Sequence, residues 1–160
     1  MASYLKMTIL AGVLAETCRS AAQRTTLDGD YYVEYGLNDA QDGIVFVYQF
    51  EQNTASWMRL MLGSDTITDG TDVIEFNAGG PDDMTGTVDG DATADATDDI
   101  TWGAPEEVGS GLMTFTVERP LDTSDADDYV IPADSVWTLG WQLCTTSGDL
   151  ATAPNLTGSI

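Results

Sequence analysis

The chain has 160 residues, of which 42% are hydrophobic, so it is long enough to fold as one domain around a sizeable core. Its 27 acidic residues outnumber its five basic ones, which gives a net charge of -22, and it contains no histidine. The absence of imidazole excludes Ser-His-Asp triads and histidine-bound zinc. The negative charge predicts that neither nucleic acid nor an anionic membrane surface is a partner.

The N-terminal residues 1–22 have the layout of a secretory signal peptide. Lys6 precedes an apolar run from Met7 to Ala15, and small residues follow at Ser20 and Ala22. The alternative is an amphipathic N-terminal helix. A signal peptide would make the protein secreted or place it at the cell surface. No other stretch approaches the ~18 apolar residues of a membrane-spanning helix, so we expect no membrane span.

Beyond the leader, short apolar runs are separated by Gly, Asp, Asn and Pro, and no ten-residue stretch has helical periodicity. We expect strands at residues 31–35, 43–52, 56–62, 72–77, 84–88, 99–102, 112–119 and 135–143. The three-residue link Asn53-Thr54-Ala55 predicts that the second and third of these form a hairpin. Without crossover helices, the pattern favours an antiparallel β-sandwich of about eight to ten strands.

Two of the expected strands show a clear alternation. Met113, Phe115 and Val117 share one face of their strand, which Pro120 then ends or confines to a sheet edge. In the last expected strand Trp137 and Trp141 share a face with two leucines. We expect this face to be a wall of the core, the alternative being a platform for a ligand.

Acidic segments offer candidate ligands for calcium, which binds oxygen atoms. The segment at 89–99 lacks the central glycine and the final glutamate of an EF-hand loop, so a solvated loop is the alternative there. The second segment begins at residue 122, and its alternative is a turn in which Asp side chains accept hydrogen bonds from nearby backbone amides. The candidate residues are Asp89, Asp91, Asp95, Asp122, Asp125 and Asp127.

In their order and spacing, four motifs over roughly residues 27–145 resemble the DOMON domain. They are a strand pair closing on Trp57 and Gly63, the unit Gly70-Thr71-Asp72 before an apolar strand, a strand ending in Arg119-Pro120-Leu121-Asp122, and a late strand with Trp137. The resemblance implies an immunoglobulin-like β-sandwich, usually extracytoplasmic, that binds haem b or a sugar. Residues 146–160 would then be a C-terminal tail.

The resemblance also bears on haem. Haem-binding members usually use a Met, at a position where this chain has Thr68, and a His, which this chain lacks. We therefore expect no cofactor. The alternative is a haem b electron-transfer domain with thioether ligation, because methionine sulfur can be an axial ligand. Its candidate ligands are Met58, Met61, Met84 and Met113.

The function expected from these observations is a secreted, non-catalytic module of the DOMON type. It would bind a carbohydrate or another small molecule, or other copies in an extracellular assembly. Aromatic rings can stack on sugars, and the candidates for this role are Trp57, Trp102, Tyr31, Tyr32 and Tyr48. Two alternatives stay open, namely the methionine-ligated haem domain and a calcium-binding structural surface protein.

Overall fold

The regular structure of the chain is entirely β. The computed structural model describes residues 23–28, 31–51, 57–77, 79–109, 111–133, 135–144 and 156–159, and within these ranges it contains twelve strands and no helix. The strands are β1 (Gln23–Asp28), β2 (Tyr31–Leu37), β3 (Gly43–Glu51), β4 (Trp57–Leu62), β5 (Asp72–Asn77), β6 (Gly80–Gly86), β7 (Ala92–Ala94), β8 (Thr101–Trp102), β9 (Glu106–Gly109), β10 (Leu112–Pro120), β11 (Leu139–Cys144) and β12 (Leu156–Ser159).

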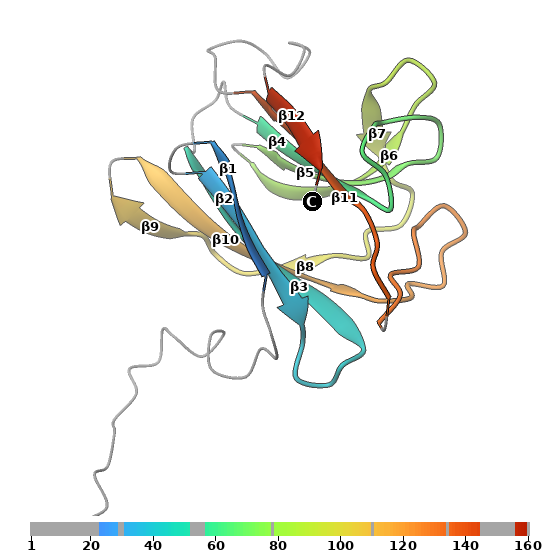
Figure 1. The fold of residues 1–160 in the computed structure, drawn as a ribbon, viewed down its shortest axis with the longest axis horizontal. Helices are drawn as coiled ribbons and strands as arrows, with labels where there is room; N and C mark the ends of the chain where they lie inside the picture. Colours follow the sequence, from blue (N-terminus) through green and yellow to red (C-terminus); the bar gives the residue numbers. More distant parts are fainter. Residues whose placement is uncertain are drawn as a thin grey trace, which may run out of the picture.

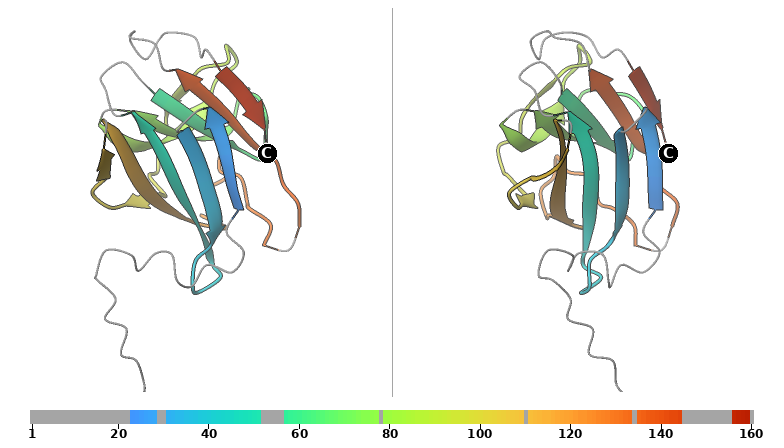
Figure 2. Two further views of the ribbon diagram at one scale, coloured as in Figure 1. Left: turned by 60° about the vertical axis from the view of Figure 1, so that its left-hand side comes forward. Right: turned by 90° about the vertical axis from the view of Figure 1, so that its left-hand side faces the viewer.

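The strands form two antiparallel sheets. The first has the order β1-β2-β3-β10-β8, with β9 also paired to β10, and the second has the order β12-β11-β4-β5-β6-β7. The sheets lie face to face as the two layers of a sandwich (Figure 1), and Figure 2 shows the same layers from two other sides. The all-β antiparallel sandwich expected from the sequence is confirmed.

The predicted hairpin between the second and third expected strands is wrong. β3 pairs with β2 and β10, whereas β4 pairs with β5 and β11, so the two strands lie in different sheets. All six residues of β4 are buried, which means that both of its faces are covered. β4 also lies in the interior of its sheet, between β11 and β5. The link at 53–55 lies outside the described residues.

Two edge strands extend the sandwich beyond the predicted limits of 27–145. β1 begins at residue 23, and β12 lies within the expected C-terminal tail, where it pairs with β11. Their sequences, QRTTLD and LTGS, carry little apolar alternation, so periodicity does not reveal them. The predicted leader, residues 1–22, lies outside the described residues.

The main core fills the space between the sheets. Phe46, Phe115 and Val117 from the first sheet meet Leu60 and Phe76 from the second, and all five are essentially inaccessible to water. Burying each such side chain contributes about 1.5–3 kcal/mol. Trp137 and Trp141 pack against this cluster while half-buried, which confirms that they belong to the wall of the core.

A smaller cluster covers the outer face of the second sheet. Met61, Ile67 and Val73 are buried there, with Met84 packed against them. Both faces of this sheet are therefore covered around β4 and β5. No helix among the described residues has the length and apolar character needed to cross a membrane.

Candidate functional site

The inward face of β10 ends in a charged residue. Phe115, Val117 and Arg119 alternate on this face, and Arg119 has no exposed surface. Its partner across the ladder is Ile44 of β3, which is also part of the core. A guanidinium carried into the interior by strand alternation requires buried acceptors.

The acceptors come from the facing sheet and from the loop that follows β10. Asp72 opens β5 in phase with Ile74 and Phe76, so it points into the same interior space. Asp83 of β6 pairs with Ile74, which makes Asp72 and Asp83 diagonal neighbours on one face of the sheet. Asp128 lies in the connection that crosses from β10 to β11.

Arg119 ties these elements together. Its Nη2 lies 2.6 Å from Asp72 Oδ2 and 3.0 Å from Asp128 Oδ2. Its Nη1 donates a hydrogen bond of 3.1 Å to the carbonyl oxygen of Tyr129, whose own N–H donates to Asp72 Oδ2 at 2.8 Å. The crossing loop is thereby held against both sheets.

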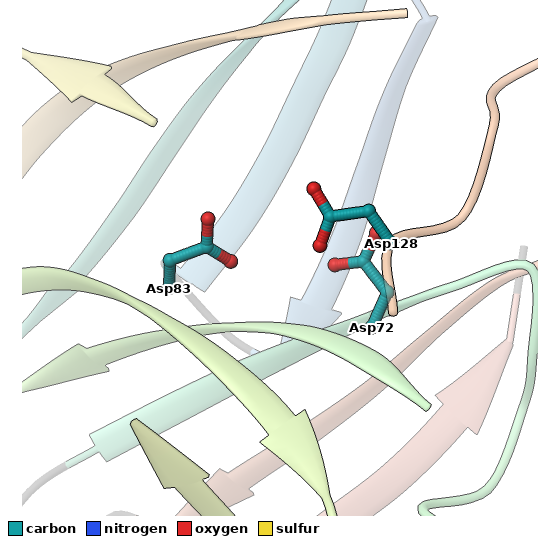
Figure 3. A group of neighbouring side chains, drawn as sticks. All are labelled: Asp72, Asp83 and Asp128. Carbon is teal, nitrogen blue, oxygen red and sulfur yellow. The ribbon is translucent and has the colours of Figure 1, made fainter. Parts of the chain in front are cut away.

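Asp72, Asp83 and Asp128, called the aspartate cluster below, converge at this point. Figure 3 shows the Asp83 carboxylate facing those of Asp72 and Asp128, and one oxygen of each lies within 4.8 Å of the others. Asp72 Oδ1 and Asp83 Oδ1 are buried and accept no hydrogen bond from the described residues. With all three carboxylates ionised, the cluster and Arg119 together carry a net charge of -2.

Burial shapes the acid–base behaviour of the aspartate cluster. Loss of hydration raises the pKa of Asp72 to about 7, although the nearby Arg119 opposes the shift. Loss of hydration likewise raises the pKa of Asp83 to about 6, against the lowering effect of the hydrogen bond donated by the Asp99 backbone. The interior at this end of the sandwich therefore disfavours uncompensated negative charge.

Gly63 makes room for the loop that crosses from β10 to β11. Gly63 has a φ of 74°, which is in the left-handed region, and a Cβ added there would overlap the ring of Tyr129. Gly63, Thr68 and Tyr129 line a cleft of about 310 Å³ together with Asp72 and Asp128. This smaller cleft leads from the surface to the aspartate cluster.

A larger cleft of about 530 Å³, called the acidic cleft below, lies beside the cluster. Its polar lining includes Asn38, Asp42, Asp99, Thr101, Glu118 and Asp122. The amide nitrogen of Asn38 donates to Glu118 Oε1 at 2.7 Å and to Asp42 Oδ1 at 2.9 Å, so it holds two of the carboxylates in place. The backbone N–H of Asp99 donates to Asp83 Oδ2 at 2.9 Å, which connects the wall of the cleft to the aspartate cluster.

The structure does not bring the five predicted sugar-stacking aromatics together. Tyr48 and Trp57 are fully buried, Tyr48 stacked on Phe115 in the core and Trp57 beneath Arg59 on the outer face of the second sheet. A buried ring offers no face to a ligand at the surface.

The other three predicted aromatics do not line either cleft. Tyr31 packs on the core, and Tyr32 lies under Arg24, 4.2 Å from the guanidinium carbon to the ring centroid. Trp102 keeps 43% of its surface exposed and rests on Gly80 of the facing sheet, where the absence of a Cβ makes room for the indole. None of the five lines the acidic cleft or the smaller cleft.

The four candidate haem ligands lie in two separate places. Met58 belongs to the main core and Met113 packs against it, whereas Met61 and Met84 lie in the small cluster on the outer face of the second sheet. None of these four methionines lines the acidic cleft or the smaller cleft. A sulfur ligand from any of the four would have to leave an apolar environment.

Among the described residues, the six acids predicted to bind calcium do not converge as one group, although Asp95 and Asp125 both lie near Asp99. Asp91 pairs with Arg59 at 2.9 Å, Asp95 accepts a hydrogen bond from the Thr85 hydroxyl, and Asp89 is exposed.

The second acidic segment forms turns, which is the alternative predicted for it. Asp122 Oδ1 accepts from the N–H of Ser124 at 2.9 Å, and Asp125 Oδ1 accepts from the N–H of Asp127 at 3.0 Å. The prediction of turns stabilised by aspartate side chains is confirmed here. Asp127 is exposed beside Asp128, which does join the aspartate cluster.

No family model matches the chain, and no significantly similar curated protein is found. The resemblance to the DOMON domain therefore stays a prediction. Two of the motif residues behind it, Asp72 and Arg119, are 47 residues apart in sequence and form the central ion pair of the site. Their pairing explains physically why both motifs carry a charge next to an apolar strand.

Proposed function

We propose that the protein is a secreted, non-catalytic module of the DOMON type that binds a neutral carbohydrate in the acidic cleft. The observation that carries this proposal is the cleft itself, because about 530 Å³ lies within the ~300–1,000 Å³ typical of small-molecule sites. Its carboxylates are positioned by Asn38 before any ligand arrives. Such preorganised acceptors lose little entropy on binding.

The lining favours a neutral ligand rich in hydroxyl groups. Carboxylate and amide oxygens accept hydrogen bonds from hydroxyl groups, and bonds to charged acceptors are roughly twice as strong as neutral ones. Ile100 and Pro120 add apolar surface on which the C–H face of a sugar ring can pack. Among the described residues no basic side chain lines the cleft, so phosphorylated or acidic glycans would be repelled.

The proposal is tested by a glycan array of neutral oligosaccharides followed by titration calorimetry with the glycans that bind. The variant Glu118→Gln keeps the shape of the side chain and removes its charge. We expect it to weaken binding about 10- to 100-fold, the equivalent of one charge-assisted hydrogen bond.

A matched control is Glu107→Gln, which changes the same residue type on the exposed strand β9, away from the acidic cleft. It should leave affinity unchanged, and the bound glycan should be recovered intact. Retention of no neutral glycan, equal effects of the two variants, or turnover of the glycan would contradict the proposal.

A further inference from the structure

We propose that the aspartate cluster is a calcium site that joins the second sheet to the loop crossing between β10 and β11. This inference is independent of the carbohydrate proposal. It rests on the free oxygens, the spacing, the charge and the orientation of the three carboxylates.

The first observation is the presence of buried oxygens without partners. Asp72 and Asp83 are 3% and 6% exposed, and the Oδ1 of each accepts no hydrogen bond from the described residues. A buried carboxylate oxygen normally has a partner, because an unpaired one has lost its hydration without a replacement hydrogen bond. Both oxygens belong to carboxylates that converge on one another in the cluster. A bound cation would be the missing partner.

The second observation is the spacing. Calcium binds oxygen at about 2.3–2.6 Å, so two ligands on opposite sides of the ion are roughly 5 Å apart. The converging oxygens lie within 4.8 Å of one another, which fits that span. Magnesium demands a near-ideal octahedron at about 2.0–2.1 Å and usually keeps several waters with only one or two carboxylates, so a cluster of three carboxylates suits calcium better. All three ligands are hard carboxylate oxygens, which calcium prefers over nitrogen and sulfur.

The third observation is the charge. When all three carboxylates are ionised, they and the guanidinium of Arg119 sum to -2, because Arg119 pairs with Asp72 and Asp128 and neutralises one of the three charges. A divalent cation brings the buried group to zero. A monovalent cation would leave one uncompensated charge in the interior.

The fourth observation is that neighbouring groups already orient the ligands. Asp72 uses Oδ2 to accept hydrogen bonds from Arg119 and the Tyr129 N–H, and Asp83 uses Oδ2 to accept from the Asp99 N–H. Each of these two aspartates thereby has its Oδ1 left to bind the ion. Hydrogen bonds from outer-shell groups orient the ligands of known metal sites in the same way. The smaller cleft, which Asp72 and Asp128 line, provides the path of entry and room for water ligands.

The experiment is titration calorimetry of the purified full chain, first freed of metal by EDTA, with calcium chloride in a potassium chloride buffer of constant ionic strength. We expect one calcium per chain and a melting temperature that rises steadily with the logarithm of calcium concentration. Magnesium should bind at least tenfold more weakly. An equal response to calcium and magnesium, or no heat and no rise in melting temperature with millimolar calcium, would overturn the proposal.

Two substitutions locate the site. Asp83→Asn removes one ligand charge while preserving shape, and it should lower calcium affinity at least tenfold. Asp89→Asn, on an exposed turn outside the cluster, should not change it. Equal affinity of both variants and wild type would show that calcium binds elsewhere and would overturn the proposal.

Terbium luminescence provides a second measurement. Tyr129, next to the cluster, can sensitise the luminescence of a bound terbium ion. Calcium should displace the terbium and abolish this luminescence. If Asp83→Asn does not melt cooperatively in EDTA, Asp128→Asn carries the same test. Loss of calcium-displaceable luminescence in that variant supports the site, and undiminished luminescence overturns it.

Discussion

Replacement of Arg119 by Met tests whether this buried guanidinium holds the end of the sandwich together. Met is unbranched and of similar length, so it fills much of the same space without charge. The substitution leaves Asp72 and Asp128 buried without their shared cation, and it removes the hydrogen bond to the carbonyl of Tyr129. The predicted effect is therefore a loss of stability rather than a local change at the surface.

The magnitude follows from burial. The side chains of Arg119, Asp72 and Asp128 are 0%, 1% and 4% exposed, so solvent does not compensate the broken pairs. Removing one partner of a fully buried ion pair typically costs about 3–5 kcal/mol. For a chain of this size, that corresponds to a fall in melting temperature of roughly 6–20 °C.

The assay is chemical and thermal denaturation in EDTA, with Arg24→Met as the matched control. Arg24 pairs with Glu34 at the surface, where its side chain is 55% exposed, so its loss should cost at most about 1 kcal/mol. Adding Asp72→Asn to Arg119→Met should cost less than the sum of the single changes, because it removes the stranded charge. A loss of less than about 1 kcal/mol for Arg119→Met would refute this reasoning.

Three further predictions concern the loop, an exposed aspartate and the net charge. Gly63→Ala should destabilise the fold by about 1–3 kcal/mol, because the φ of 74° at this position is strained for alanine and the added Cβ would meet the Tyr129 ring. The control Gly103→Ala, where a Cβ would enter open space, should be near neutral in the same denaturation experiment. The hydrogen bond donated by the Ala92 N–H, together with Arg59, lowers the pKa of Asp91 from its ordinary value of 3.8. Ionised Asp91 therefore stabilises the fold above pH 3.8, and this stabilisation is lost as the pH falls through the lower pKa of the folded state. The difference in stability between wild type and Asp91→Asn should accordingly shrink in acid, and a difference that grows in acid would contradict this. Sodium chloride should raise the melting temperature steadily, since it screens the repulsion within a chain of net charge -22, and a fall would contradict this.

Alternation along the chain predicted the sandwich because it reports which residues point inward. The alternation predicts that Phe115 and Val117 share one face, which the structure buries, and the same alternation places Arg119 on that inward face. A charged residue continuing an apolar face is a signal of a buried ion pair, and it was available in the sequence. Its partner was not, because nothing in the local pattern connects Arg119 with Asp72 across 47 residues.

The rest of the aspartate cluster could not be predicted from local pattern. Asp83 lies in the strand GPDDMTG, which contains glycine, proline and two acids and so does not resemble a buried strand. Asp128 is one of many acids in its loop, and only the crossing of that loop between sheets distinguishes it from exposed Asp127. Among so many aspartates, tertiary position rather than spacing determines which ones are buried together.

The hairpin error has a related cause. A short link after an apolar run is compatible both with a turn within one sheet and with a connection between two sheets. The strand pairings decide between them, because β4 pairs with β5 and with the distant β11 rather than with β3. The burial of both faces of β4 likewise depends on distant segments, which cover Met61 and Val73 from outside. A strand buried on one face shows alternating apolar residues, whereas a strand buried on both faces shows a continuous apolar run without that alternation.

A crystal structure of the protein grown with calcium, with anomalous diffraction measured at long wavelength, tests the central claim most directly. We expect one anomalous peak within about 2.3–2.6 Å of a carboxylate oxygen from each of Asp72, Asp83 and Asp128. Well-ordered carboxylates at this position with no anomalous peak between them would contradict it.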